Sequence, residues 1–221
     1  MTAEQVGAVS AGGVRVERLT TSGTFSLDGG TWEVDNNVWI VGDDEECVVI
    51  DAPHEAAPIL EAVGHRTLTA VLCTHAHDDH VTVVPELLEA HPRTKVALHP
   101  ADLELWRRSH PRLTPTIALA DGDTVTVGDI ELTVVHTPGH APGACCFLAP
   151  DLGVVFSGDT LFRGGPGATG RSFSDFPTII ESIRTRLLTL DPDTVVHPGH
   201  GASTTIGEEA PHLEDWIARG H

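Results

Sequence analysis

The feature that most constrains this chain is a cluster of metal-type side chains at residues 74–80, which read Thr-His-Ala-His-Asp-Asp-His. Three imidazoles and two carboxylates this close together cannot all be buried as ordinary core groups, because each would need its own partner. A divalent cation removes the conflict, since neutral imidazole and carboxylate are its natural ligands. His75 and His77 lie two residues apart at a strand end and can face the same side. Asp79 and His80 follow where the chain turns into a helix, so four donors converge from one loop.

The length and charge of the chain limit its class. With 221 residues it is long enough for one domain with a sizeable core. We expect residues 13–221 to form that domain, after a small, polar and loose segment at residues 1–12. The net charge is −19. Because such a charge repels phosphate backbones and anionic lipid surfaces, we expect neither a nucleic-acid nor a membrane partner.

The cysteines and the apolar runs indicate a cytoplasmic protein. The cysteines lie in or beside apolar runs and form no framework of spaced pairs, so we expect reduced and mostly buried thiols; they are Cys47, Cys73, Cys145 and Cys146. The first residues lack the basic start and apolar core of a signal peptide. No run approaches the roughly 18 apolar residues that a spanning helix needs. Cytoplasmic localisation is therefore the expectation.

Apolar runs of strand length alternate with segments of helical spacing along the chain. We expect strands at 14–19, 37–41, 47–51, 69–74, 95–99, 124–127, 130–136, 144–148, 154–157 and 194–197. We expect helices at 54–63, 81–91, 100–109, 176–190 and 211–218. Both halves contain strands and helices, which suits two sheets packed together with helices outside.

Further metal-type side chains follow other apolar strands, each at a glycine-containing turn. His140 closes Thr-Pro-Gly-His, Asp159 lies in Ser-Gly-Asp-Thr, and His200 closes His-Pro-Gly-His. Any one of these alone would more often be structural than functional. Together with the cluster at 74–80 they indicate one metal site assembled at strand ends.

The order of these motifs resembles the metallo-β-lactamase superfamily over nearly the whole chain, from the Val-Ile-Asp strand that ends at Asp51 to Gly199-His200. Within it, Ser-Gly-Asp-Thr-Leu-Phe at 157–162 is similar to the glyoxalase II-like thioester hydrolases. The resemblance implies an α/β fold, a four-layer αββα sandwich in which two mixed sheets pack face to face with outer helices. It also implies that the metals lie in a groove at the sheet edges.

The resemblance implies a division of ligands as well. One metal would take His75, His77 and His140, the other would take Asp79, His80 and His200, and Asp159 would bridge them. Asp79 would also orient a metal-bridging hydroxide or accept its proton, and Asp51 would brace the metal loops from behind. Two cations about 3.5–4 Å apart can hold such a hydroxide and stabilise the oxyanion formed at a carbonyl carbon. Zinc is the expected metal, although the same ligands accept iron or manganese.

The segment after the Gly-Asp motif bears on the substrate. Glutathione-specific members carry a Gly-Cys-Gly-Lys-like stretch and a nearby tyrosine there. This chain reads Arg-Gly-Gly-Pro-Gly-Ala-Thr-Gly-Arg from Arg163 to Arg171, has no tyrosine, and ends soon after His200. We therefore expect the thioester of another low-molecular-weight thiol, with mycothiol as one candidate. Arg163 and Arg171 flank loop amides that could bind an anionic group; the alternative is a flexible loop with solvated arginines.

Three other functions stay open on the sequence alone. A mononuclear iron persulfide dioxygenase shares most of the ligand set, although its Gly-Arg-Thr-Asp-Phe stretch is absent here. The other two are a lactone or other ester hydrolase and a non-catalytic metal-binding module. The oligomeric state is not indicated. Among the other histidines, His54 and His110 read as surface or capping residues.

Overall fold

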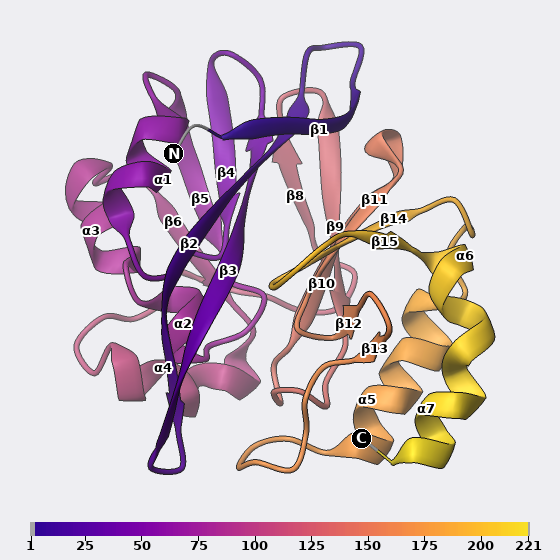
Figure 1. Cartoon of the computed structure of the whole chain (residues 1–221). Coiled ribbons are helices and arrows are strands. Elements are labelled where there is room, and N and C mark those ends of the chain that lie inside the picture. Colours follow the sequence, from indigo (N-terminus) through magenta and orange to yellow (C-terminus); the bar gives the residue numbers. More distant parts are fainter. Residues whose placement is uncertain (1–2, 221) are drawn as a thin grey trace.

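The computed structural model, which describes residues 3–220, contains two β-sheets packed face to face with helices on both outer faces (Figure 1). The first sheet contains, in spatial order, β1 (Glu4–Val9), β2 (Arg15–Leu27), β3 (Gly30–Gly42), β4 (Glu46–Ile50), β5 (Thr67–Leu72), β6 (Lys95–Leu98) and β7 (Ile117–Ala118). It is antiparallel from β1 to β4 and parallel from β4 to β7. It is therefore a mixed sheet.

The second sheet is also mixed. It contains, in spatial order, β15 (Thr204–Thr205), β14 (Val195–Pro198), β11 (Val154–Gly158), β10 (Cys145–Ala149), β9 (Ile130–His136) and β8 (Thr124–Val127). Its β11–β14 pair is parallel and its other pairs are antiparallel. Two short strands, β12 (Leu161–Phe162) and β13 (Gly165–Pro166), form a separate ribbon.

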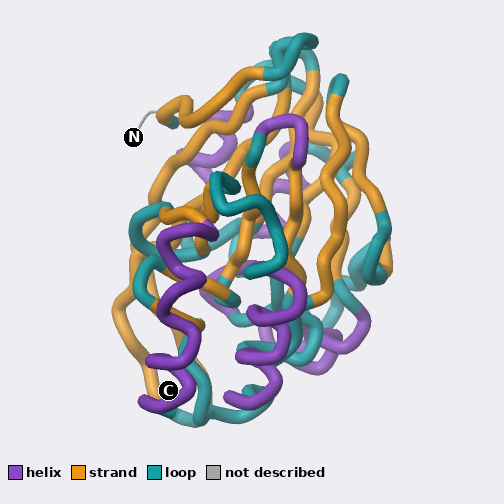
Figure 2. Tube along the Cα trace, turned by 90° about the vertical axis from the view of Figure 1, so that its right-hand side faces the viewer, coloured by secondary structure: helices purple, strands orange, loops and turns teal. Residues whose placement is uncertain are grey.

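The helices form the outer layers. The first half of the chain supplies α1 (Ala56–Val63), α2 (Asp78–Val81), α3 (Val84–Ala90) and α4 (Leu103–Ser109), and the second half supplies α5 (Phe176–Ser182), α6 (Ile206–Glu209) and α7 (Leu213–Arg219). Figure 2 looks onto the side where two helices lie in front of the strands. The four-layer αββα sandwich predicted from the resemblance is confirmed. Among the described residues, no helix is long and apolar enough to cross a membrane.

Three apolar clusters hold the layers together. The two sheets meet around Trp39, Phe147 and Phe156, which are buried between them. Trp106 of α4 lies in the cluster that covers the outer face of the first sheet, and Trp216 of α7 lies in the one that covers the second. Since full burial of a large apolar side chain contributes roughly 1.5–3 kcal/mol, these clusters fix the strand ends from which the site is built.

The hairpin of β2 and β3 is much longer than predicted. The strand expected at 14–19 continues to Leu27, and the strand expected at 37–41 already begins at Gly30. The two strands meet at a two-residue turn in which Asp28 and Gly29 both have positive φ. Such a turn matches the twist of a hairpin. In Figure 1 the hairpin reaches past the other strands of its sheet. The added residues are largely polar and half-exposed, so no apolar run marked them as strand.

Three other segments differ from expectation. The segment at 1–12, expected to be loose, contains β1, which pairs with β2 through register contacts such as Glu4↔Arg18; residues 1–2 lie outside the described residues. An edge strand of this kind depends on backbone hydrogen bonds and needs no apolar run. The helix expected at 81–91 begins only at Val84, as α3 with a proline in its first turn, and the residues before it form the separate short helix α2. The helix expected at 176–190 continues α5 as a π-helical turn at Ile183–Leu187.

Candidate metal centre

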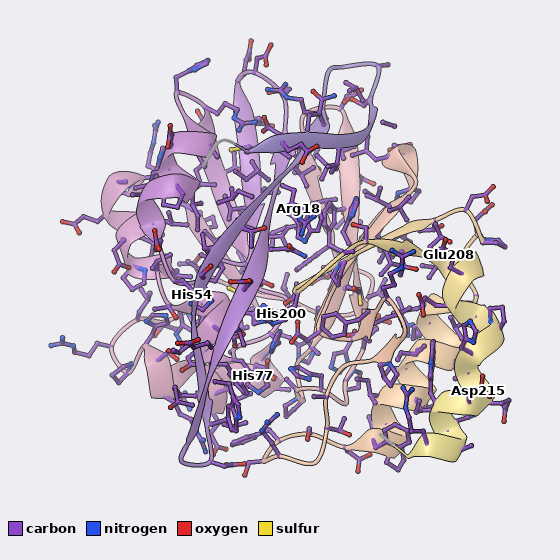
Figure 3. The ribbon with its side chains drawn as sticks, in the orientation of Figure 1. Arg18, His54, His77, His200, Glu208 and Asp215 are labelled. Carbon is purple, nitrogen blue, oxygen red and sulfur yellow. The ribbon has the colours of Figure 1, made fainter. Side chains whose placement is uncertain are left out.

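All seven predicted ligand side chains come together at the ends of strands from both sheets. His75 and His77 follow β5, Asp79 and His80 lie in α2, His140 follows β9, Asp159 follows β11, and His200 follows β14. Each of the seven belongs to a group whose donor atoms all lie within 4.8 Å of one another: His75, His77 and His140; His75, His80 and Asp159; Asp79, His80 and His200. Figure 3 labels His77 and His200 beside the β2–β3 hairpin.

The first group consists of three imidazoles with nitrogens directed at one another. His77 Nδ1 lies 3.0 Å from both His75 Nε2 and His140 Nε2. His140 Nδ1 donates to the carbonyl of Ala168 at 2.8 Å, so the Nε2 of a neutral His140 carries a lone pair. One proton on His77 Nδ1 can serve only one of the two contacts. The arrangement therefore leaves lone pairs facing each other, which a cation between them would stabilise.

The group of Asp79, His80 and His200, called the second group from here on, is oriented in a similar way. His80 Nδ1 lies 2.8 Å from Asp51 Oδ2, and His200 Nδ1 donates to the carbonyl of Asp35 at 2.7 Å. The Nε2 atoms of both rings are thereby directed at Asp79 Oδ2, at 3.6 Å from His80 and 3.4 Å from His200. Partners on the far nitrogen fix the ring orientation and tautomer of a metal-binding histidine.

Asp159 lies between the two groups. Its Oδ2 is 3.5 Å from His140 Nε2 and 3.4 Å from His200 Nε2, while its Oδ1 is 3.4 Å from His80 Nε2. Gly199 makes this approach possible, because a Cβ there would lie 2.3 Å from Asp159 Oδ1. One carboxylate is thus within reach of both sets of imidazoles.

The pKa values of the two groups shift in opposite directions. Burial, with neighbouring imidazoles, lowers the pKa of His75 well below its usual range and that of His77 to about 3. Burial also opposes the charged form of His200, but Asp159 and Asp79 outweigh it and raise the pKa of His200 to about 10. The first group is therefore neutral at pH 7, whereas the second carries positive charge among carboxylates. Cations held by both groups would supply that charge in place of protons.

A buried carboxylate oxygen without a partner also indicates that these residues fit a pair of divalent metals. In the described part of the chain, Asp159 Oδ1 is fully buried without a hydrogen-bond partner. An unsatisfied buried carboxylate oxygen is costly, and such an atom calls for an unplaced water or ion. Because Asp159 Oδ1 faces His80 Nε2, the centre of the cluster is where this oxygen requires a partner.

Asp51 braces two of the loops, as the resemblance implied. It directly follows β4 with a positive φ of 60°, and its Oδ1 accepts from the backbone N–H of Thr74 at 2.7 Å. Its Oδ2 accepts from Thr74 Oγ1 at 2.7 Å and from His80 Nδ1 at 2.8 Å. Asp51 thereby ties the end of β5 to α2.

A second buried acid, Asp102, was missed in the sequence. Its Oδ2 accepts from the backbone N–H of Ala76 at 2.9 Å, and its Oδ1 accepts from that of Gly143 at 2.5 Å. It thus joins the loop of His75 and His77 to the loop of His140. An aspartate inside a segment predicted as helix gives no sign of this role, because both partners come from distant loops.

Three further polar residues were also missed or misread. Asn36 of β3 is fully buried against Asp79, and His54, expected to be a surface or capping residue, is half-buried and lies 2.7 Å from the Asn36 Oδ1 atom. His110, for which the expectation was the same, is buried and donates to the carbonyl of Val81 at the end of α2. The one available signal was the Asn-Asn pair that precedes the apolar run of β3.

The two predicted substrate-binding arginines line a hollow of about 640 Å³ beside the centre. Its wall is the glycine-rich loop from Phe162 to Arg171, together with Arg219. Ala168 lines the hollow and also accepts the hydrogen bond from His140. Arg171 in addition lies 4.1 Å over the ring of Trp32 at the hairpin end. The loop therefore contacts the hairpin through Arg171, whose side chain remains exposed.

Comparison with known proteins identifies the class. The pattern of the metallo-β-lactamase superfamily matches residues 31–200, well over half of the chain. The chain therefore belongs to the metallo-β-lactamase superfamily, as the motif order predicted.

Three similar proteins, one from sequence comparison and two from solved structures, indicate the kind of member that this chain resembles. Hydroxyacylglutathione hydrolase GloC of Haemophilus influenzae is 30% identical over 188 residues, which cover 78% of this chain and 89% of that protein. A protein solved in a di-iron-bound form is 34% identical with a TM-score of 0.72, over 86% of this chain and 96% of the other. ETHE1 from Myxococcus xanthus is 27% identical with a TM-score of 0.72, and the match covers 90% of this chain and 89% of that protein. These relatives and the His/Asp groups support a metallohydrolase.

Proposed function

We propose that the protein is a metal-dependent hydrolase that cleaves the thioester of a low-molecular-weight thiol. The observation that carries the proposal is the position of Asp159, with one carboxylate oxygen 3.5 Å from His140 Nε2 and 3.4 Å from His200 Nε2. A carboxylate shared by two histidine groups suits two divalent cations, for which zinc is the expected identity. Such a pair supplies a water of pKa about 7 and polarises a carbonyl oxygen.

The residues of the chain have separate tasks in this reaction. His75, His77 and His140 would hold one cation, Asp79, His80 and His200 the other, and Asp159 would contact both. Asp79 Oδ2 faces the same space as the two Nε2 atoms of its group, so it can orient an attacking water and hold its proton. Asp51 and Asp102 keep the three ligand-bearing loops in register.

The hollow beside the centre is our proposed site for the thiol carrier. Arg163, Arg171 and Arg219 gather there in a chain whose net charge is −19. Guanidinium groups bind carboxylates in a fork geometry and also donate to hydroxyl oxygens of a sugar-containing carrier such as mycothiol. The loop differs from the Gly-Cys-Gly-Lys-like stretch of glutathione-specific enzymes, and the chain has no tyrosine. Both features support a carrier other than glutathione.

The test combines metal content with turnover. Protein purified without chelator is analysed for zinc, iron and manganese, and then assayed on S-lactoyl thioesters of glutathione and of mycothiol. We expect about two zinc ions per chain and thioester cleavage. One iron per chain with O₂ consumption on persulfides would instead assign a persulfide dioxygenase.

The same assays distinguish an ester hydrolase from a non-catalytic metal-binding module. Lactone or ester cleavage without thioester turnover would assign an ester hydrolase, and two bound metals without turnover on any of these substrates would assign the non-catalytic module. A preference for S-lactoylglutathione over every other thioester would overturn the choice of carrier and leave the reaction in place.

A further inference from the structure

Asn36 is a polar side chain with 0% exposure in the middle of the site, and the ligand set does not account for it. It extends from β3 toward α2. Its Nδ2 donates to the backbone carbonyl of Asp79 at 2.8 Å and to Asp79 Oδ2 at 3.1 Å. The same atom lies 3.3 Å from His80 Nε2 and 3.5 Å from His200 Nε2. Asn36 therefore contacts the whole group proposed to hold the second cation.

The direction of the Asn36 amide is set from behind by His54. The Oδ1 of Asn36 lies 2.7 Å from His54 Nε2, whose N–H donates to it. An asparagine amide has nearly the same shape in both orientations, so hydrogen bonds decide which is adopted. A flipped amide would place its oxygen against two oxygens of Asp79 and its nitrogen against the His54 N–H. The His54 donor thus keeps the Asn36 donor directed at Asp79.

Two backbone features make room for the His54 ring. His54 has a φ of 53°, in the left-handed region that a non-glycine residue adopts at an energetic cost. Opposite it, β2 has Gly23, where a Cβ would lie 2.3 Å from His54 Nδ1. Such unfavourable conformations persist where the surrounding structure over-determines them, and they cluster at functional sites. In Figure 3 the labelled His54 and His200 lie on either side of the β2–β3 ribbon.

We propose that His54 and Asn36 are a positioning pair that holds the Asp79 carboxylate for the second cation. The inference rests on the proposed metal centre and goes beyond its ligands. Residues that orient ligands from behind set metal affinity, and their loss typically costs about 10- to 100-fold. The hydrogen bonds of the pair in the described chain reach Asp79, His80 and His200 of the second group, so we expect its effect to fall mainly on the second cation.

The test measures the stepwise binding of zinc to the chelator-treated full chain. Binding is monitored by calorimetry in the presence of a competing chelator. His54→Leu removes the donor at similar size, and we expect the first zinc to bind as in the wild type and the second about 10- to 100-fold more weakly. His54→Gln keeps an N–H donor and should restore second-zinc affinity to within about 10-fold of wild type. His65→Leu, at an exposed histidine, is the matched control and should bind both ions normally.

A second variant keeps the test decisive if His54→Leu folds poorly. Asn36→Leu removes the donor beside Asp79 at similar size, so it should show the same selective loss. Equal weakening of both zinc ions, or unchanged binding of both in His54→Leu and Asn36→Leu, would overturn the positioning pair while the two-metal centre stands. A wild-type chain that binds fewer than two ions would overturn the centre and the pair together.

Discussion

The guanidinium of Arg171 lies 4.1 Å over the ring of Trp32, which joins the glycine-rich loop to the end of the β2–β3 hairpin. Trp32 stacks in turn on Phe25 at 5.7 Å, and Phe25 packs against the His77 ring at 5.0 Å. The backbone N–H of Ser172 also donates to Asp28 Oδ2 at 2.9 Å. Loop, hairpin and first histidine group therefore form one contact chain beside the proposed substrate site.

Replacement of Arg171 by alanine should raise KM for the thioester about 5- to 10-fold and change kcat less. The side chain lines the hollow, and a cation–π contact at a partly exposed site contributes about 0.5–1 kcal/mol to its placement. Steady-state kinetics measure both constants. Trp32→Ala should also raise KM. The double variant should raise KM little further, because both substitutions remove the same contact between Arg171 and Trp32. Arg112→Ala, at an exposed arginine, is the control, and an unchanged KM in Arg171→Ala would remove this residue from the substrate site.

Replacement of Asp159 by asparagine should abolish the two-metal centre. The variant keeps the shape of the side chain but removes the charge that both histidine groups face. We expect metal content to fall from about two ions per chain to one or fewer, and kcat/KM to fall at least about 100-fold. Loss of a residue that only supports a metal ligand already lowers metal affinity or activity about 10- to 100-fold. Elemental analysis and turnover measure the two effects. Asp151→Asn, at an exposed aspartate, is the control, and a variant that retained two ions would contradict the shared role of Asp159.

Asp102 should make the stability of the metal-free protein depend on pH. Burial raises the pKa of this carboxyl to about 6, although two backbone N–H groups favour its charged form. Because the folded state then binds the proton more tightly than the unfolded state, this group stabilises the fold at low pH. The contribution is lost as the pH rises from about 4 to about 6. Asp102→Asn removes this titration.

Urea unfolding of both chains at pH 4 to 8, with chelator present, tests the assignment. The free energy of unfolding of the wild type, minus that of Asp102→Asn, should fall with rising pH up to about 6 and stay level above it. A difference that is the same at every pH would show that Asp102 does not titrate in this range.

The native protein should show no reactive thiol near neutral pH. All four cysteines are buried and unpaired in the described chain, and burial raises the pKa of Cys47 and of Cys146 to about 11. The thiolate is the reactive form, so iodoacetamide at pH 8 should leave the folded chain unmodified. Intact mass measurement should show no added group in the native protein and four after denaturation. Modification of the folded chain would contradict the buried placement.

The composition of the site could be predicted from the sequence because its signals are local. The cluster at 74–80 directly follows an apolar strand, and three further ligands each follow an apolar strand and a glycine-containing turn. The chemistry of metal binding limits which residue types can stand at these positions. His140, Asp159 and His200 were each found in this way. The sandwich could be predicted for a related reason, since apolar runs such as 47–51 and 154–157 must be buried on both faces.

The residues around the ligands could not be predicted, because their partners lie far along the chain. Asp102 joins Ala76 to Gly143, and His54 acts on Asp79 only through Asn36 of another strand. A hydrogen bond between distant segments depends on which strand ends the fold makes neighbours, and sequence spacing carries no trace of it. The sequence by itself therefore determined which side chains can bind metal. The tertiary structure decided how those side chains are oriented, because orientation comes from contacts that exist only after the sheets have packed.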